Sequence, residues 1–80
     1  MLKIKDEINL KELEKFGYDE YDDGDYLKTM PDDIHELYIH KTDKIIYVYT
    51  EISKRYAQEH EINDLIKAGY VEKVEERYDI

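Results

Sequence analysis

The chain has 80 residues, no cysteine, 41% charged residues and a formal net charge of −9. This length allows one domain, spanning residues 1–80, with a thin core, and the missing cysteines exclude disulfides, thiolate zinc sites and a cysteine nucleophile. The acidity argues against direct binding to nucleic acid or to an anionic membrane, because phosphate contacts need an excess of Lys and Arg. It favours a basic protein partner, or it only keeps a small protein in solution.

The N-terminal residues carry charges from Lys3 onward, so no apolar stretch there is long enough for a signal peptide. No apolar run of the length that spans a membrane occurs elsewhere in the sequence. We therefore expect a cytoplasmic protein.

The first predicted helix follows Asn9, which is a favourable N-cap and forms a capping box with Glu12. Gly17 ends this helix, because a helix commonly closes on a left-handed residue. Tyr18 can then fold back onto Leu13, as in a Schellman ending.

The period of the apolar residues changes to two after this helix, and Asp23-Gly24 is a strong hairpin signal. A two-residue turn at this pair would set Tyr21 opposite Tyr26 and Asp22 opposite Asp25. The second pair is repulsive, so the arm is expected to be loose. Residues 30–33 then read as a turn or connector.

Residues 36–50 form the clearest β segment, with two runs flanking Thr42-Asp43. A turn at this pair separates the side chains into two sets, whereas a three-residue loop would mix them. It would pair Leu37 with Val48, Tyr38 with Tyr47, Ile39 with Ile46 and His40 with Ile45. One side is then aliphatic, and the other, which we call the tyrosine side, carries Tyr38, His40, Tyr47 and Tyr49 beside Ile45.

The ending of the first helix recurs later in the chain, where residues 64–70 align with residues 12–18. We expect Leu65 and Tyr70 to pack together as their counterparts do. The residues that begin the two segments differ, so the likeness indicates that both helices end in the same C-terminal motif and does not indicate a duplication.

The second predicted helix buries Ile62, Leu65 and Ile66. The sequence leaves two alternatives for the first residue of this helix: it begins near Glu59, or it extends back to Ser53. Residues 70–75 follow as a last strand, although they also fit a helical turn.

Together these elements predict an α+β fold, a small two-layer domain with an antiparallel sheet of three to four strands and two short helices on one face.

Each known arrangement of catalytic residues that we searched for lacks at least one of its members in this sequence. The only serine, Ser53, lacks the glycine-flanked setting of a nucleophile elbow, and the three glycines are isolated, so no phosphate loop exists. His35, His40 and His60 do not have the spacing of a paired-histidine metal site. We expect a protein that is not an enzyme and that needs no cofactor and no metal.

The closely spaced acids of residues 19–25 call for comparison with a calcium-binding loop. Placing Gly24 at the glycine position of an EF-hand puts Asp19 first and Asp23 fifth. Tyr21 then falls on the third ligand position and Met30 on the twelfth, where a bidentate glutamate is required. The loop therefore fails as a calcium site.

Two surfaces are candidate partner-binding sites. The first is the tyrosine side, which favours an interface because tyrosine gives a large contact area with a polar end; the alternative is that the residue 18–26 arm or the C-terminus covers it. The second is an acidic run, either a solvated hairpin tip or a surface that mimics the negative charge of nucleic acid. The run consists of Asp19, Glu20, Asp22, Asp23 and Asp25.

Residues 3–17 and 64–74 resemble small uncharacterised proteins of phages and prophages in Gram-positive bacteria. The resemblance implies no activity and transfers no site residue. It implies only that the chain is comparable to small acidic accessory proteins of phages. Many such proteins act in the host cytoplasm, where they bind and inhibit host or defence factors. These factors are often nucleic-acid enzymes.

The leading hypothesis is a non-catalytic binding protein that engages a basic, nucleic-acid-binding protein as an inhibitor or DNA mimic. The acidic run would steer association, and the tyrosine side would supply the anchors. The competing hypothesis is a self-associating structural or accessory module, in which the tyrosine side of one copy pairs with that of another in a homodimer.

Overall fold

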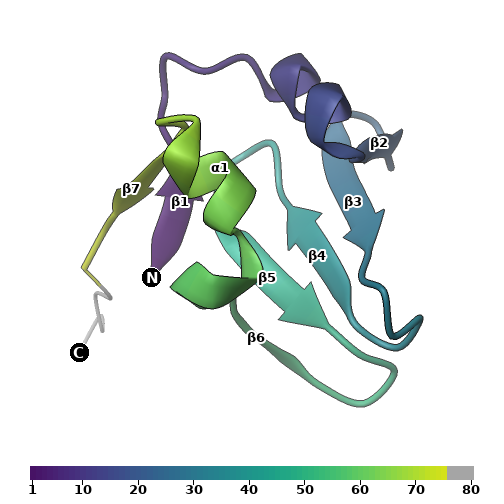
Figure 1. The fold of residues 1–80 in the computed structure, drawn as a ribbon. Coiled ribbons are helices and arrows are strands. Elements are labelled where there is room, and N and C mark those ends of the chain that lie inside the picture. The colour runs from purple at the N-terminus through teal and green to yellow at the C-terminus, as the bar shows by residue number, and fades with distance from the viewer. Residues whose placement is uncertain (76–80) are drawn as a thin grey trace, which may run out of the picture.

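A computed structural model describes residues 1–75 (Figure 1). The strands are β1 (Leu2–Ile4), β2 (Asp19–Tyr21), β3 (Asp25–Thr29), β4 (Glu36–Ile39), β5 (Ile46–Tyr49), β6 (Lys54–Tyr56) and β7 (Val71–Lys73). The helical segments are the 3₁₀ helices η1 (Leu10–Phe16) and η2 (Glu59–Glu61) and the α-helix α1 (Asn63–Lys67).

Strands β2 to β6 form a five-stranded antiparallel sheet in chain order, and β1 pairs with β7 in a separate two-stranded sheet. Figure 1 shows α1 in front of the larger sheet and the β1–β7 pair beside it. The predicted α+β class with an antiparallel sheet is confirmed. The predicted number of three to four strands in the sheet is wrong: the larger sheet has five, because β6 is a strand that the sequence pattern does not announce. The sequence pattern also does not announce β1, which pairs with β7 in the second sheet.

The core lies between one face of the larger sheet and the helical segments. The predicted aliphatic side of the central hairpin faces it, and η1 and α1 each contribute buried residues. The main side chains of this core are Leu10, Leu13, Leu37, Ile39, Ile46, Val48, Ile62 and Leu65. One face of the larger sheet is thus covered by the helical segments.

The central hairpin has the predicted register. Leu37 pairs with Val48, Tyr38 with Tyr47 and Ile39 with Ile46. The remaining predicted partners, His40 and Ile45, lie beyond the strand ends, and Ile45 instead forms a bridge with Lys3 of β1.

The register of the β2–β3 arm differs from the predicted one. Tyr21 pairs with Asp25 and Glu20 with Tyr26, so the loop has three residues and not two. Residues 22–24 all have positive φ, which Asp and Gly tolerate better than other residues. Because side chains alternate along a strand, Asp25 and not Tyr26 shares a face with Tyr21, and the pairing of Tyr26 with Ile39 places Tyr26 in the core.

The first helix begins and ends where the sequence predicts, but it is a 3₁₀ helix. The Asn9 side chain accepts a hydrogen bond from the Lys11 N–H at 3.0 Å. Glu12 forms an ion pair with Lys15 in place of the predicted capping box. At seven residues this helix is longer than most 3₁₀ helices, which proteins use mainly in short pieces.

Both helical segments close with the predicted Schellman ending. The Tyr18 N–H donates to the Leu13 carbonyl at 3.3 Å, and the Tyr70 N–H donates to the Leu65 carbonyl at 3.1 Å. The intervening glycines are left-handed, with φ of 89° at Gly17.

The start and the buried stripe of the second helix need correction. Residues 53–56 do not extend it, since Lys54–Tyr56 is strand β6. A turn of 3₁₀ helix at Glu59–Glu61 precedes α1, so the start near Glu59 is the closer alternative. Ile62 is fully buried, but Ile66 is 37% exposed and does not belong to the stripe.

The two ends of the described chain are joined by β1 and β7. Leu2 pairs with Lys73 and Ile4 with Val71, and the amino group of Met1 donates to the Val74 carbonyl at 3.0 Å. The predicted strand over residues 70–75 is confirmed. Among residues 1–75, no helix has the length and apolarity needed to cross a membrane.

Candidate protein-binding face

The face of the five-stranded sheet opposite the core is lined by aromatic rings. Cross-strand pairing sets them side by side: Tyr38 lies opposite Tyr47, and Tyr47 lies opposite Tyr56. We call this surface the aromatic face. It consists of Tyr21, Tyr38, His40, Tyr47, Tyr49 and Tyr56.

The rings of the aromatic face contact one another across four strands. Tyr21 meets Tyr38 edge-on, with 6.0 Å between ring centroids, and Tyr38 lies 5.1 Å from Tyr49. Tyr47 stacks on Tyr56 with a centroid distance of 5.5 Å. Edge-to-face and offset arrangements of this kind are the favourable geometries for aromatic pairs. The surface is therefore one continuous aromatic layer.

A buried carboxylate fixes the centre of this layer. Asp25 accepts a hydrogen bond of 2.8 Å from the Tyr38 hydroxyl and one of 2.9 Å from the Lys41 N–H. His40 links this group outward, because its Nδ1 lies 3.5 Å from Asp25 and its Nε2 lies 3.0 Å from the Tyr49 hydroxyl. The network holds the two tyrosines in fixed orientations.

The acid–base properties of this centre follow from its burial and its hydrogen bonds. Burial alone would raise the pKa of Asp25, but the bonds from Lys41 and Tyr38 outweigh it and hold the pKa of Asp25 below its usual value. Burial and the neighbouring Asp25 carboxylate raise the pKa of the Tyr38 hydroxyl. Asp25 is thus an ionised structural group, and the Tyr38 hydroxyl stays protonated.

A lysine side chain lies across the other end of the aromatic face. The Lys54 ammonium lies 4.3 Å from the ring centroid of Tyr47 and 5.4 Å from that of Tyr49. Both distances are within the range of cation–π attraction.

The acidic run is divided between two environments. Asp19, Glu20, Asp22 and Asp23 are exposed, and Asp23 at the loop tip binds the Lys41 side chain. Asp25 is only 9% exposed, so it is wrong to count it among the surface acids. The one-residue change of register explains the difference.

The tyrosine side is partly covered by the arm, which is the alternative left open by the sequence. Tyr38 is 9% exposed beneath Tyr21, which is itself 55% exposed. Tyr47 and Tyr49 are half-buried, and Tyr56 at the edge is 39% exposed. The most exposed rings of the aromatic face are therefore Tyr21 and Tyr56, both of which sequence reasoning missed.

A groove of about 370 Å³ lies in the aromatic face. Its walls are aromatic, and Glu36 supplies a carboxylate among them. The groove is lined by Tyr21, Leu27, Glu36, Tyr38, His40 and Tyr49.

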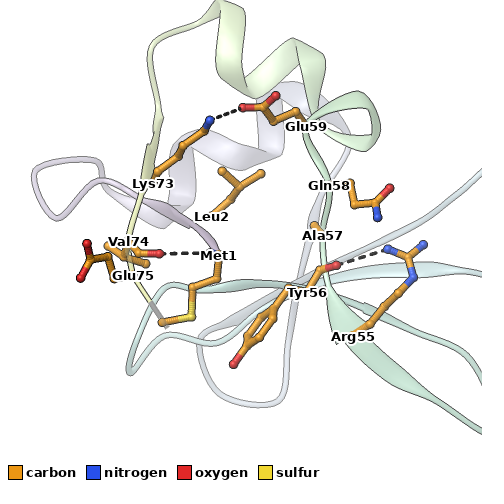
Figure 2. A pocket seen from close by; sticks show the side chains of 10 residues that line it. All are labelled: Met1, Leu2, Arg55, Tyr56, Ala57, Gln58, Glu59, Lys73, Val74 and Glu75. Atoms are coloured by element: carbon orange, nitrogen blue, oxygen red, sulfur yellow. Dashed lines mark hydrogen bonds and ion pairs between the residues drawn. The ribbon is translucent and has the colours of Figure 1, made fainter. Parts of the chain in front are cut away.

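A larger pocket, of about 800 Å³, lies between the two ends of the described chain and the start of η2 (Figure 2). Figure 2 shows that most of its charged groups already have partners: Lys73 pairs with Glu59, and the amino group of Met1 donates to Val74. Charges that are already paired offer little selectivity for a ligand, so the aromatic face is the better candidate site. Within residues 1–75, no group of His, Asp or Glu is arranged to hold a metal ion.

No protein-family model, curated protein or solved structure matches this chain, so the candidate site is defined by its own geometry alone.

Proposed function

We propose that this chain is a non-catalytic binding protein. Its aromatic face and the exposed acids of its β2–β3 arm, which we call the acidic arm, together engage a basic protein. The observation that carries the proposal is the contact of Tyr21 with Tyr38, which makes the acid-bearing β2–β3 arm and the aromatic face one surface. Aromatic anchors beside exposed charge are the usual composition of a protein interface. Exposed acids speed and orient the approach of a basic partner.

The same face is poorly suited to nucleic acid. Stacked tyrosines on an open sheet can hold bases, but such sites also need a positive groove that follows the phosphates. The strands of this face place three acids on it, Asp19, Asp25 and Glu36, against Lys54 on the edge strand β6, and the chain as a whole carries a net charge of −9. A protein that itself binds nucleic acid has the matching basic surface, so we propose such a host or defence protein as the partner, inhibited through its basic cleft. The resemblance to phage proteins supports this choice.

Site-specific photocrosslinking tests the proposal. A benzoyl-phenylalanine in place of Tyr21 or Tyr56 should crosslink to a basic protein from the lysate of a Gram-positive bacterium. The same probe in place of Ile66, which is exposed on α1, is the matched control and should give no such product. Equal crosslinking at all three positions would count against a specific face.

Association kinetics with the captured partner test the steering role. The triple variant Asp19→Asn, Asp22→Asn, Asp23→Asn removes three charges and preserves the loop, because Asn tolerates positive φ as Asp does. We expect slower association and a weaker salt dependence. The control variant Glu7→Gln, Glu51→Gln, Glu75→Gln loses the same charge elsewhere, and equal kinetics for the two variants would refute steering by the arm.

Self-association through the aromatic face is the second candidate function. It is favoured by the position of Tyr56, which is 39% exposed on the edge strand of the sheet. Sedimentation at micromolar concentration separates the two: a tight dimer that the Tyr56→Ser variant dissolves supports self-association, and a monomer rejects it.

A further inference from the structure

We infer that the groove of the aromatic face is a site for a guanidinium group, and hence for an arginine side chain of the partner. This inference rests on the proposed function and specifies its chemistry. It follows from three features of the groove: its aromatic walls, its carboxylate and the lysine that already occupies the neighbouring rings.

The walls of the groove suit a flat cation. Tyr38 and Tyr49 lie 5.1 Å apart with their planes inclined at 37°, and Tyr21 stands nearly perpendicular to Tyr38. Guanidinium groups stack on aromatic faces and are more weakly hydrated than ammonium groups, so they lose less solvation on entering such a site. The hydrogen bonds of Asp25 and His40 hold these rings in place before any ligand arrives.

The charge of the groove is negative. Glu36 lies directly opposite Tyr49 on the neighbouring strand, and it has no ion-pair partner within residues 1–75. Its carboxylate can accept two hydrogen bonds from a guanidinium fork. The buried Asp25 adds a second negative charge beneath the Tyr38 hydroxyl.

Lys54 shows that these tyrosines accept a cation. Its ammonium lies over Tyr47 and Tyr49, on the strand that flanks Tyr49 opposite to Glu36. The lysine thus lies against Tyr49, which is also a wall of the groove, but Lys54 itself does not line the groove. Its like charge also opposes the entry of a second cation, so Lys54 acts as a built-in competitor.

The test uses NMR titration of the full chain at low ionic strength with a blocked Gly-Gly-Arg-Gly-Gly peptide. The same peptide with citrulline in place of arginine keeps the shape and removes the charge. We expect saturable shifts of the Leu27, Tyr38 and Tyr49 amides with the arginine peptide and none with the citrulline peptide. Shifts confined to Asp22 and Asp23 would mean simple attraction to the acidic tip and would overturn the inference.

Two variants should change the affinity in opposite directions. Glu36→Gln should weaken arginine binding about two- to fivefold, and Lys54→Gln should strengthen it by a similar factor. Glu7→Gln, which loses one charge outside the groove, is the matched control. It should leave unchanged the affinity for the arginine peptide that is measured from the shifts of the groove amides. Equal effects of Glu36→Gln and Glu7→Gln would reject the assignment of Glu36.

The outcomes also separate the inference from the proposed function. If the peptide does not bind but crosslinking at Tyr21 and Tyr56 persists, the guanidinium site is wrong and the binding face stands. If the peptide binds the groove but no protein is crosslinked, the site is supported and the proposed partner interaction fails.

Discussion

The hydroxyl of Tyr38 donates a 2.8 Å hydrogen bond to the carboxylate of Asp25, and this bond joins the aromatic face to the acidic arm. Asp25 also accepts from the Lys41 N–H, so one carboxylate ties together β3, β4 and the loop that follows β4. The arrangement of the candidate interface therefore depends on a group that a partner would scarcely touch.

Removing this carboxylate should destabilise the fold. Asp25→Ala leaves the Tyr38 hydroxyl and the Lys41 N–H without their acceptor, and we expect the free energy of unfolding to fall by about 1–3 kcal/mol. Urea denaturation measures the change. In a double-mutant cycle with Tyr38→Phe the coupling should be about 1 kcal/mol, and strictly additive effects would show that the bond contributes nothing.

Tyr18 and Tyr26 should respond in opposite ways to the loss of a hydroxyl. The Tyr18 hydroxyl is buried and has no hydrogen-bond partner in the described part of the chain, and burial raises its pKa. Tyr18→Phe should therefore leave stability unchanged or raise it by about 1 kcal/mol. Tyr26→Phe, the matched control, loses a 3.2 Å bond to Glu14 and should lower stability slightly. A larger loss at Tyr18 than at Tyr26 would contradict this view of the core.

The placement of α1 predicts unequal effects for two isoleucines. Ile62 is fully buried, so Ile62→Ala should cost about 2–5 kcal/mol and could prevent folding. Ile66 is partly exposed, so Ile66→Ala should cost less than about 1 kcal/mol. Thermal unfolding followed by circular dichroism compares them, and similar losses would restore the stripe predicted from the sequence.

Stability should decrease in acid partly through Glu61. Its two-pronged ion pair with Arg55 lowers the pKa of Glu61 to about 2, from the usual 4.5. Folding thus depresses this pKa, so the stabilisation is complete above about pH 4.5 and is lost as the pH falls toward 2. We expect it to contribute about 1–2 kcal/mol, because the Arg55 side chain is 45% exposed and solvent screens the pair.

The Glu61→Gln variant tests this contribution. Its unfolding midpoint in urea should be lower than that of the wild type at pH 6, and the difference should shrink toward pH 2.5. Glu51→Gln, at an exposed position, is the control and should follow the wild type throughout. A constant difference across this pH range would exclude the proposed linkage.

The parts of the fold that follow from the sequence are those with local causes. The central hairpin is predictable because only one register separates Leu37 and Ile39 from the tyrosines. The two Schellman endings are predictable because the motif depends only on residues close together in the sequence. A glycine ends the helix, and the apolar residue after it packs back on the last turn.

The remaining parts depend on contacts that a local pattern does not contain. Strand β6 has the sequence Lys54-Arg55-Tyr56, which shows no apolar alternation, and it is placed by the stacking of Tyr56 on Tyr47. The arm is displaced by one residue because three successive residues adopt positive φ. Four of the six residues of the aromatic face were therefore predictable, while Tyr21 and Tyr56 required the tertiary pairing.

The β1–β7 pair has a consequence for how the protein is made. Leu2 and Ile4 are buried in the core, but their strand partner comes only with residues 71–73. During synthesis the first strand, which otherwise has only the bridge of Lys3 to Ile45, must therefore wait for residues 71–73 before this pairing can form. The five-stranded meander pairs neighbours along the chain and can form earlier, whereas contacts of large sequence separation form slowly. The pairing of β1 with β7 should thus be the last step of folding.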